Sequence, residues 1–316
     1  MQNLAHQIAQ AEKQGPMMQE KLMELLLMES HFLGKTSSLD RAYEIGSKSQ
    51  DPLLRAKALA AVHRFSEALA LLEGVEGGEE QRASILAALG RPEVPTKATG
   101  YAELTAQASA LAAVGRFEEA EHAYLEAIRD LRSTSPFPFA WVHFFRGVMW
   151  SERAGDRNRG ALCYAKALEH LPQYVVANVH LAEIEAERGD VKAAIDRLKK
   201  IAEAEDPEPT ALLGELERDE AKIEQAKQRY EALLAKHPLA YADHAAEFYA
   251  TRNVGRAWEL AKINLDNRET ERSLAIAIHA ARAAGKTAEA CELVKRANAK
   301  KRTGVELTNL LGGCEP

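Results

Sequence analysis

The sequence has little cysteine, and what it has is widely spaced. Cys163, Cys291 and Cys314 are an odd number, and none of them belongs to a Cys-x-x-Cys motif. Zinc knuckles need closely spaced cysteine pairs, and small disulfide-stabilised folds need an even and denser set. The sequence therefore predicts neither a zinc knuckle nor a disulfide framework, and it favours a reducing compartment.

Targeting signals and membrane spans are also missing. Residues 1–15 are polar, unlike the basic region and apolar core of a secretory signal. The most apolar stretch, residues 22–28, is interrupted by Glu24 and is far shorter than the ~20 apolar residues of a transmembrane helix. No Asn-x-Ser/Thr acceptor occurs. We therefore expect a cytoplasmic protein with no membrane partner.

An excess of charge of one sign is absent as well. Lys and Arg total 41 and Asp and Glu total 47, which gives a formal net charge of -6. Nucleic-acid-binding proteins concentrate positive charge on one face, so this balance predicts no nucleic-acid partner. Apolar residues make up 46% of the chain and charged residues 28%, which is typical of a folded protein rather than a disordered one.

Common catalytic motifs do not occur either. Residues 34–36 and 285–287 both have the sequence Gly-Lys-Thr, but Glu29 and Ala280 stand where a phosphate-binding loop needs its first glycine. The sequence contains no Gly-x-Ser-x-Gly and no His-Glu-x-x-His motif. We expect no cofactor, and a binding protein is favoured over an enzyme.

What the sequence does contain is an internal repeat. From residue 101 onward, a small residue recurs at intervals of 40, 34, 32, 31 and 33 residues. These small residues are Ala120, Gly160, Ala194, Ala226, Ala257 and Ala290. The residues four positions later are Tyr124, Tyr164, Leu198, Tyr230, Ala261 and Val294. Positions four apart share one face of a helix, so the small residue permits a close helix crossing and the larger one fills the space above it. Ala261 is the exception, since it is no larger than Ala257.

The breaks between these runs predict six pairs of antiparallel amphipathic helices. The first helices are expected at 102–114, 141–154, 175–188, 208–219, 240–252 and 271–284. The second helices are expected at 117–131, 157–170, 191–204, 222–236, 255–266 and 287–300. One pair cannot bury its apolar face alone, so the pairs must stack. Since no run alternates with period two, the predicted fold class is all-α.

Residues 1–100 are less regular. Helices are predicted at 2–14, 17–33, 39–48, 52–62, 66–73 and 79–90. Residues 91–100 have the composition of a linker. The sequence thus divides into an N-terminal helical region with degenerate repeats (1–100), an array of about six helix pairs (101–300), and a C-terminal cap and tail (301–316) with a short helix over 304–311.

The array resembles the tetratricopeptide repeat (TPR) family. The similarity is strongest over residues 141–172, where Gly147, Gly155, Gly160, Tyr164, Ala167 and Pro172 have the family's spacing. It extends over about two thirds of the chain, although the turns at Asp219–Ala221 and Asn253 depart from the pattern. The resemblance implies a right-handed α-solenoid, a superhelix of stacked antiparallel helix pairs whose first helices line a concave surface that binds a protein or peptide partner.

Six residues are the candidates for partner binding on that surface. They are Phe145, Arg146, Met149, Val179, His180 and Glu183. Phe145, Met149 and Val179 are predicted to form an apolar patch on the inner wall. Arg146 alone has the chemistry of the carboxylate clamp by which some TPR domains bind acidic C-terminal tails, so such a tail is not the expected ligand.

An alternative is an enzyme or a metal-dependent protein. His180 and Glu183 share a helix face at i, i+3, as do His244 and Glu247, with Asp243 beside them. These side chains could hold a metal ion or move protons, but the two sets lie two repeats apart, which favours ordinary polar residues. A third alternative is a regulator whose residues 1–100 bind a signal while the array forms a homo-oligomer.

The repeat register yields a stability prediction. Ala194→Leu and Ala226→Leu should each lower the free energy of unfolding by ~1–3 kcal/mol, because a larger side chain at a helix crossing overpacks it. Denaturant titration of each variant measures the change. Unchanged stability in both variants would show that the register is wrong.

Overall fold

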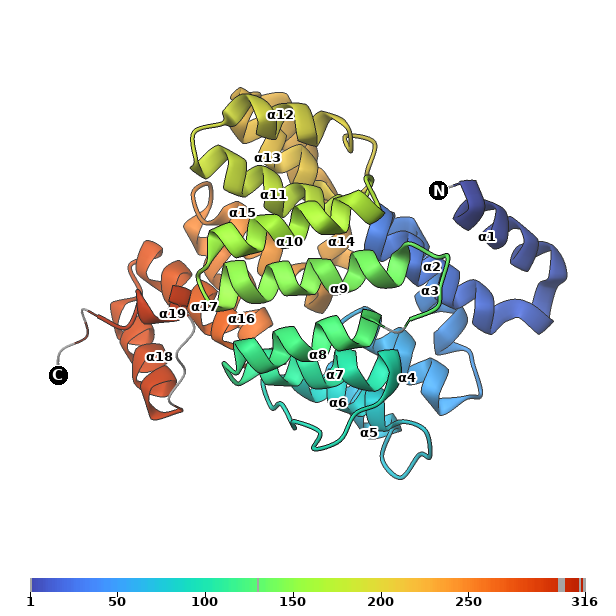
Figure 1. The fold of residues 1–316 in the computed structure, drawn as a ribbon. Helices are drawn as coiled ribbons and strands as arrows, with labels where there is room; N and C mark the ends of the chain where they lie inside the picture. The colour runs from blue at the N-terminus through green and yellow to red at the C-terminus, as the bar shows by residue number, and fades with distance from the viewer. Residues whose placement is uncertain (1, 130, 301–304, 313, 315–316) are drawn as a thin grey trace. The chain divides into compact units, whose positions relative to one another are not determined.

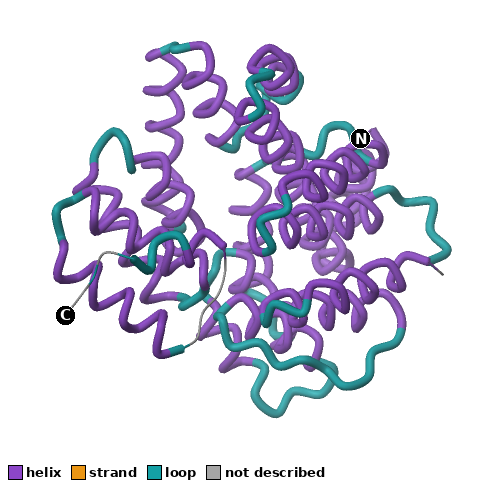
Figure 2. Tube along the Cα trace, turned by 60° about the vertical axis from the view of Figure 1, so that its left-hand side comes forward, coloured by secondary structure: helices purple, strands orange, loops and turns teal. Residues whose placement is uncertain are grey.

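The computed structural model describes residues 2–129, 131–300, 305–312 and 314, and most of them are helical (Figure 1). No strand occurs among these residues (Figure 2). The predicted all-α fold of repeated antiparallel helix pairs is therefore confirmed. Within the same part of the chain, no helix combines the length and the apolar character that crossing a membrane requires.

The N-terminal hundred residues form helices close to the predicted ones. They are α1 (Gln2–Gln14), the 3₁₀ turn η1 (Gly15–Met18), α2 (Gln19–Leu33), α3 (Thr36–Ser47), α4 (Pro52–Ala61), α5 (Phe65–Leu71) and α6 (Glu79–Ala88). Pro52 opens α4, where its missing N–H costs nothing, and the Asp51 side chain accepts a hydrogen bond from the backbone N–H of Leu53. Residues 91–99 are irregular, as predicted from their composition.

The predicted helix pairs follow. They are α7 (Gly100–Ala113) with α8 (Phe117–Arg129), α9 (Phe137–Val148) with α10 (Arg157–His170), α11 (Val175–Glu187) with α12 (Val191–Lys199), α13 (Pro207–Glu217) with α14 (Glu220–Lys236), α15 (Pro238–Tyr249) with α16 (Val254–Asn267), and α17 (Glu271–Ala283) with α18 (Thr287–Ala299). The start of α9 is four residues earlier than predicted, because Phe137, Pro138 and Phe139 form its first turn. The predicted C-terminal helix is α19 (Val305–Thr308); its expected first residue, Gly304, lies outside the described residues.

Small residues mark the helix crossings, as the register predicted. Ala194 and Ala226 have no exposed surface, and Ala120 and Ala257 have none either. Gly160 is the one glycine among the six recurring small residues. A Cβ atom at this position would lie 2.5 Å from Cβ of Ser151, which follows α9, so no larger residue fits unless Ser151 moves.

The residues group into two compact units, and each unit draws on two stretches of chain. Unit 1 comprises residues 1–81 and 171–232, and unit 2 comprises residues 82–170 and 233–316. These are groupings in space, whereas the boundaries at residues 100 and 300 are positions along the sequence, and the latter remain predictions.

In unit 1, the turn between α2 and α3 packs against residues far along the sequence. Gly34 adopts a left-handed conformation (φ +61°) and ends α2, and its carbonyl accepts a hydrogen bond of 2.9 Å from the backbone N–H of Asp206. A Cβ atom at Gly34 would lie 3.1 Å from Cβ of Asp206 and 3.2 Å from Val175, which explains the glycine. The Gly-Lys-Thr sequence here is thus a tight turn.

Glu205 supplies the N-terminal cap that α3 lacks locally. Its carboxylate accepts hydrogen bonds from the Ser37 backbone N–H at 2.7 Å and from the Ser37 hydroxyl at 2.9 Å. No side chain next to α3 caps it, so a carboxylate 168 residues later takes that place.

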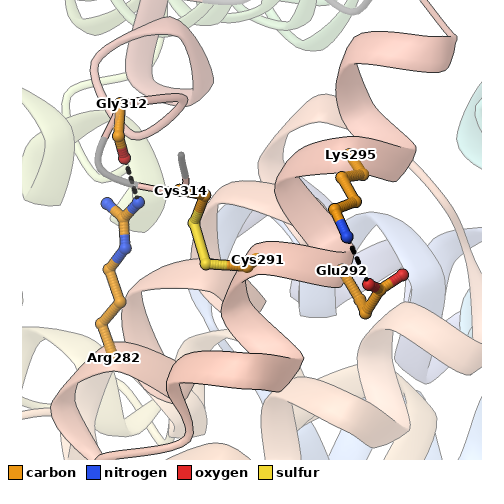
Figure 3. Close-up of a disulfide and its surroundings, with 6 residues drawn as sticks. All are labelled: Arg282, Cys291, Glu292, Lys295, Gly312 and Cys314. Atoms are coloured by element: carbon orange, nitrogen blue, oxygen red, sulfur yellow. Dashed lines mark hydrogen bonds and ion pairs between the residues drawn. A yellow bond between two sulfur atoms is a disulfide. The ribbon is translucent and has the colours of Figure 1, made fainter. Parts of the chain in front are cut away.

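Two of the three cysteines form a disulfide, and the prediction that excluded one was wrong. Cys291 of α18 is bonded to Cys314, with their Cα atoms 5.4 Å apart (Figure 3). An odd number of cysteines excludes only the pairing of all of them, so one disulfide was still possible. The 23 residues between Cys291 and Cys314 do not by themselves show that the two cysteines come close in space. Cys163 is buried and is not in a disulfide.

His31 in α2 lies in an aromatic cluster of unit 1. Its Nε2 is 2.6 Å from the Tyr174 hydroxyl, and the Phe32 ring lies 4.9 Å away, centroid to centroid. Burial lowers the pKa of His31 to about 4, because the cluster disfavours the charged imidazolium.

This environment predicts acid sensitivity. Since the pKa of His31 is about 4 in the folded state and 6.5 as the ordinary value, the unfolded state binds more protons between these pH values. Stability should therefore fall as the pH is lowered from about 6.5 toward 4. His31→Phe should flatten this dependence, by up to ~1.4 kcal/mol per pH unit, in urea titrations across that range. The control is His122→Gln, on an exposed side chain, which should keep the wild-type slope; an unchanged slope in His31→Phe would contradict the assignment.

Candidate functional site

Two cavities in unit 2 include residues from first helices of the repeat pairs in their walls. The first, called the arginine-lined cavity, has a volume of about 190 Å³ and includes Arg153, Arg268 and Arg272 in its wall. The second, called the alanine-lined cavity, has a volume of about 330 Å³ and lies along α15 and α17. Cavities that combine apolar wall with a few placed charges are typical of binding sites.

Ion pairs connect the helices around the arginine-lined cavity. Arg272 of α17 donates to Glu247 of α15 at 2.7 Å and lies 3.9 Å from Glu152. Arg268, at the end of α16, donates to Asp243 of α15, whose side chain is only 3% exposed. Such pairs hold their side chains in defined positions, so the charged wall is preorganised for a ligand.

A π-helix, η2 (Met149–Arg153), brings Glu152 into this wall. It continues α9 and carries Met149, Trp150 and Ser151 into the buried interior, while Glu152 and Arg153 line the cavity. A π-helix contains one extra residue per turn, which changes the direction of the side chains that follow, and it often occurs at functional sites.

Alanines form the floor of the alanine-lined cavity. Ala246 of α15 and Ala250, which directly follows that helix, line it together with Ala275, Ile276 and Ala280 of α17. Side chains this small leave space between the two first helices that a larger apolar side chain can fill. This cavity is therefore suited to the side chain of a docked segment.

Residues 305–312 contribute to the walls of these cavities. We call Val305–Gly312 the C-terminal segment; it includes α19, which contacts α17 and η2. Leu307 is 1% exposed and lies in the wall of the arginine-lined cavity, and Leu310 lies in the wall of the alanine-lined cavity. At the end of the segment, Arg282 of α17 donates a hydrogen bond of 2.6 Å to the Gly312 carbonyl (Figure 3).

The predicted groove residues of unit 2 mostly serve its interior. Met149 is 1% exposed and fills the core, so it offers no surface to a partner. Phe145 is partly buried against Trp141, 4.2 Å away between ring centroids. Arg146 forms an ion pair with Glu121 of α8, and both side chains are 14% exposed.

The Arg146 pair is part of a larger polar cluster. Burial alone would raise the pKa of Glu121, but hydrogen bonds from Arg146 and from the Trp150 indole hold it below its ordinary value. His143, whose Nδ1 lies 2.7 Å from Arg146, has its pKa lowered to about 4, first by burial and then by that cation. Arg146 thus stabilises the contact between α8 and α9.

The other three predicted groove residues belong to unit 1. Val179 is 3% exposed and packs in the core with Ala194 and Leu198, so it does not form the predicted apolar wall. The reason is that its position on α11 faces the second helix of its own pair. His180 and Glu183 remain partly exposed, with Nδ1 and Oε2 3.3 Å apart.

The alternative metal residues form ion pairs. Asp243 and Glu247 are engaged by Arg268 and Arg272, and Nε2 of His244 lies 3.7 Å from Asp243. His180 and Glu183 lie in unit 1, whereas these three residues lie in unit 2. Among the described residues, no group of three or more His, Cys, Asp or Glu side chains could hold a metal ion.

The sequence interpretation missed the residues that line the two cavities. Arg153, Arg268, Arg272, Leu307 and Leu310 belong to no recognisable motif. One signal was available: Thr270 and Ser273 form a capping box, which fixes the start of α17 and thus the place of Arg272. The folding back of the chain after α18 had no such signal.

Comparisons with known proteins concern the fold. No protein-family model matches the sequence, and no curated protein sequence does. A similar solved structure is a chain of the crystal structure of the APC/C hetero-tetramer Cut9–Hcn1, with 13% identity, a TM-score of 0.48, and coverage of 94% of this chain and 62% of that one. This protein thus spans less than two thirds of the length of that chain.

Two further solved structures are similar over much of their length. PilW, a widely conserved type IV pilus biogenesis factor, has 15% identity and a TM-score of 0.36, with coverage of 66% of this chain and 96% of that one. A tetratricopeptide repeat protein from Parabacteroides merdae has 15% identity and a TM-score of 0.43, with coverage of 86% and 98%. A shared fold does not determine function, which depends on the residues of the site.

The buried ion pair at the cavity gives a testable prediction. Arg268→Met removes the cation that faces the buried Asp243, so it should lower the free energy of unfolding by ~3–5 kcal/mol. The double variant Asp243→Leu/Arg268→Met should regain most of that loss, because an apolar pair replaces an ion pair at little cost.

Denaturant titration measures both effects. The control is Lys192→Met, which removes a partner from an exposed pair with Asp196 and should change the stability by less than ~1 kcal/mol. A double variant as unstable as Arg268→Met would show that Asp243 and Arg268 do not act as a pair.

Proposed function

We propose that this protein is an interaction scaffold that binds a short helical segment of a partner protein across the two cavities of unit 2. The observation that carries the proposal is the C-terminal segment, which lies on the first helices with one leucine in the wall of each cavity. A partner segment of similar chemistry would use the same surface. No catalytic step is part of this function.

The repeat architecture supports this mode of binding. Stacked helix pairs already hold α15 and α17 at a fixed spacing, and the pairs of Arg272 with Glu247 and Glu152 tie η2 to them. A rigid surface loses little conformational entropy on binding, so more of the contact energy contributes to affinity. The small side chains of the alanine-lined cavity supply the space, and the arginines define the polar edge.

Binding in trans tests the proposal. In the full-length protein, Leu307→Ser together with Leu310→Ser should release the chain's own segment. A fluorescent peptide with the sequence of residues 305–312 should then bind saturably in an anisotropy titration. Ala250→Glu in the same protein should weaken binding at least ~10-fold, about 1.4 kcal/mol, because a carboxylate would occupy the apolar wall.

Matched controls separate this site from general adhesion. Leu162→Glu changes an exposed residue of α10, 72% accessible and outside both cavities, and should leave the affinity unchanged. A peptide with serine in place of Leu307 and Leu310, which keeps Leu311, should not bind. Equal affinity for the two peptides, or no effect of Ala250→Glu, would refute the proposed function.

A further inference from the structure

The C-terminal segment is fastened at its far end by two bonds. The disulfide joins Cys314, two residues beyond the segment, to Cys291 of α18, and Arg282 of α17 holds the Gly312 carbonyl (Figure 3). At its near end the segment follows α18 after a short connection. The disulfide therefore closes a covalent ring that runs from Cys291 to Cys314, and the C-terminal segment is part of that ring.

The contacts of the segment alone are modest. Leu307 is its only residue classed as buried among those whose side chains are described, and Leu310 is partly buried. Val305 is 39% exposed, and Asn309 is exposed as well. Leu311 is partly buried as well. Burial of one leucine and parts of two others contributes less free energy than ordering the backbone of the segment costs. A covalent tie to α18 lowers the entropic cost of ordering the segment, because it restricts the conformations of the released chain.

We propose that the Cys291–Cys314 disulfide keeps the C-terminal segment on the two cavities as a built-in competitor, and that a partner helix with two leucines three residues apart gains access when the disulfide is reduced. The inference rests on the proposed function of the same cavities and adds its regulation. Leu307 lies in α19, and Leu310 lies two residues beyond its end. Residues at i and i+3 of a helix share one face, so a partner helix that is continuous over this length can place a leucine at each cavity.

The chemical step is a thiol–disulfide exchange. A dithiol reductant attacks one sulfur, the Sγ–Sγ bond breaks, and a mixed disulfide forms until the second thiol of the reductant displaces it. Each cysteine gains one electron and one proton, and the reductant leaves as its own disulfide. The reduced segment then remains joined to the array only through α18, which lowers its effective concentration at the cavities.

Hydrogen exchange of the whole chain tests, without any ligand, whether the disulfide holds the C-terminal segment in place. We call this effect of the disulfide the lock. In the oxidised protein, the amides of Asn309 and Leu310, which donate within the segment, and those along α17 should be protected. Reduction with dithiothreitol, or Cys314→Ser, should speed exchange in residues 305–312 at least ~10-fold. Cys163→Ser removes the buried third thiol and keeps the disulfide, so it should respond like the wild type.

The same preparations test access to the cavities. The fluorescent peptide of residues 305–312 should bind the reduced wild type and Cys314→Ser, and bind the oxidised wild type at least ~10-fold more weakly. Equal exchange of the segment in the oxidised, reduced and Cys314→Ser proteins would overturn the lock. Alkylation of the air-oxidised protein after unfolding gives a second test, since an intact disulfide leaves only the Cys163 thiol to react. Three alkylated thiols per chain would show that the disulfide does not form and would overturn the lock too.

The lock and the proposed function fail differently. If the exchange rates respond to reduction but the peptide binds neither redox state nor the Leu307→Ser/Leu310→Ser variant, the proposed function fails while the segment is still controlled by the disulfide. If the peptide binds oxidised and reduced wild type equally, the cavities bind such a helix but the disulfide does not regulate them.

Discussion

Close crossing of the two helices in each pair is the constraint on which the rest of the structure depends. Ala194 and Ala226 have no exposed surface at their crossings, and Gly160 has no space for even a methyl group beside Ser151. Because each second helix lies this close to its first helix, the larger residue four positions later is driven into the core. The first helices then have a fixed spacing, and the alanine-lined cavity between α15 and α17 is a consequence of it.

Polar contacts add specificity to this apolar framework. The pairs of Arg146 with Glu121 and of Arg272 with Glu247 each connect helices from different repeat pairs of unit 2. A partly buried guanidinium gains from a matching carboxylate in one geometry only, so these contacts select one packing among several of similar apolar area. The same chemistry leaves ordered charge at the edge of the arginine-lined cavity, where a ligand can use it.

The sequence was sufficient for local structure and insufficient for the site. A period of small residues depends on contacts within one helix pair, so the presence and order of the helices and the burial of Ala194 followed from spacing, whereas bounds such as the start of α9 did not. Met149 and Val179 are buried, although the resemblance placed them on the inner surface. It indicated which helices line that surface, but the side chains that each helix presents there depend on its rotation about its own axis, which packing against neighbouring helices determines. The disulfide and the place of Leu307 require the path of the chain after α18, which no periodic pattern encodes.

The cap that Glu205 provides to α3 has a consequence for the order in which the chain can fold. The Ser37 amide and the Gly34 carbonyl find their partners at residues 205 and 206, and His31 meets Tyr174. During synthesis, the Ser37 and Gly34 contacts cannot form until residues 205 and 206 have emerged from the ribosome, and the contact of His31 with Tyr174 cannot form until residue 174 has emerged. Unit 1 must therefore wait for a long intervening stretch that belongs to unit 2, so its completion is slow for an all-helical protein and leaves an apolar face of α2 in need of protection meanwhile.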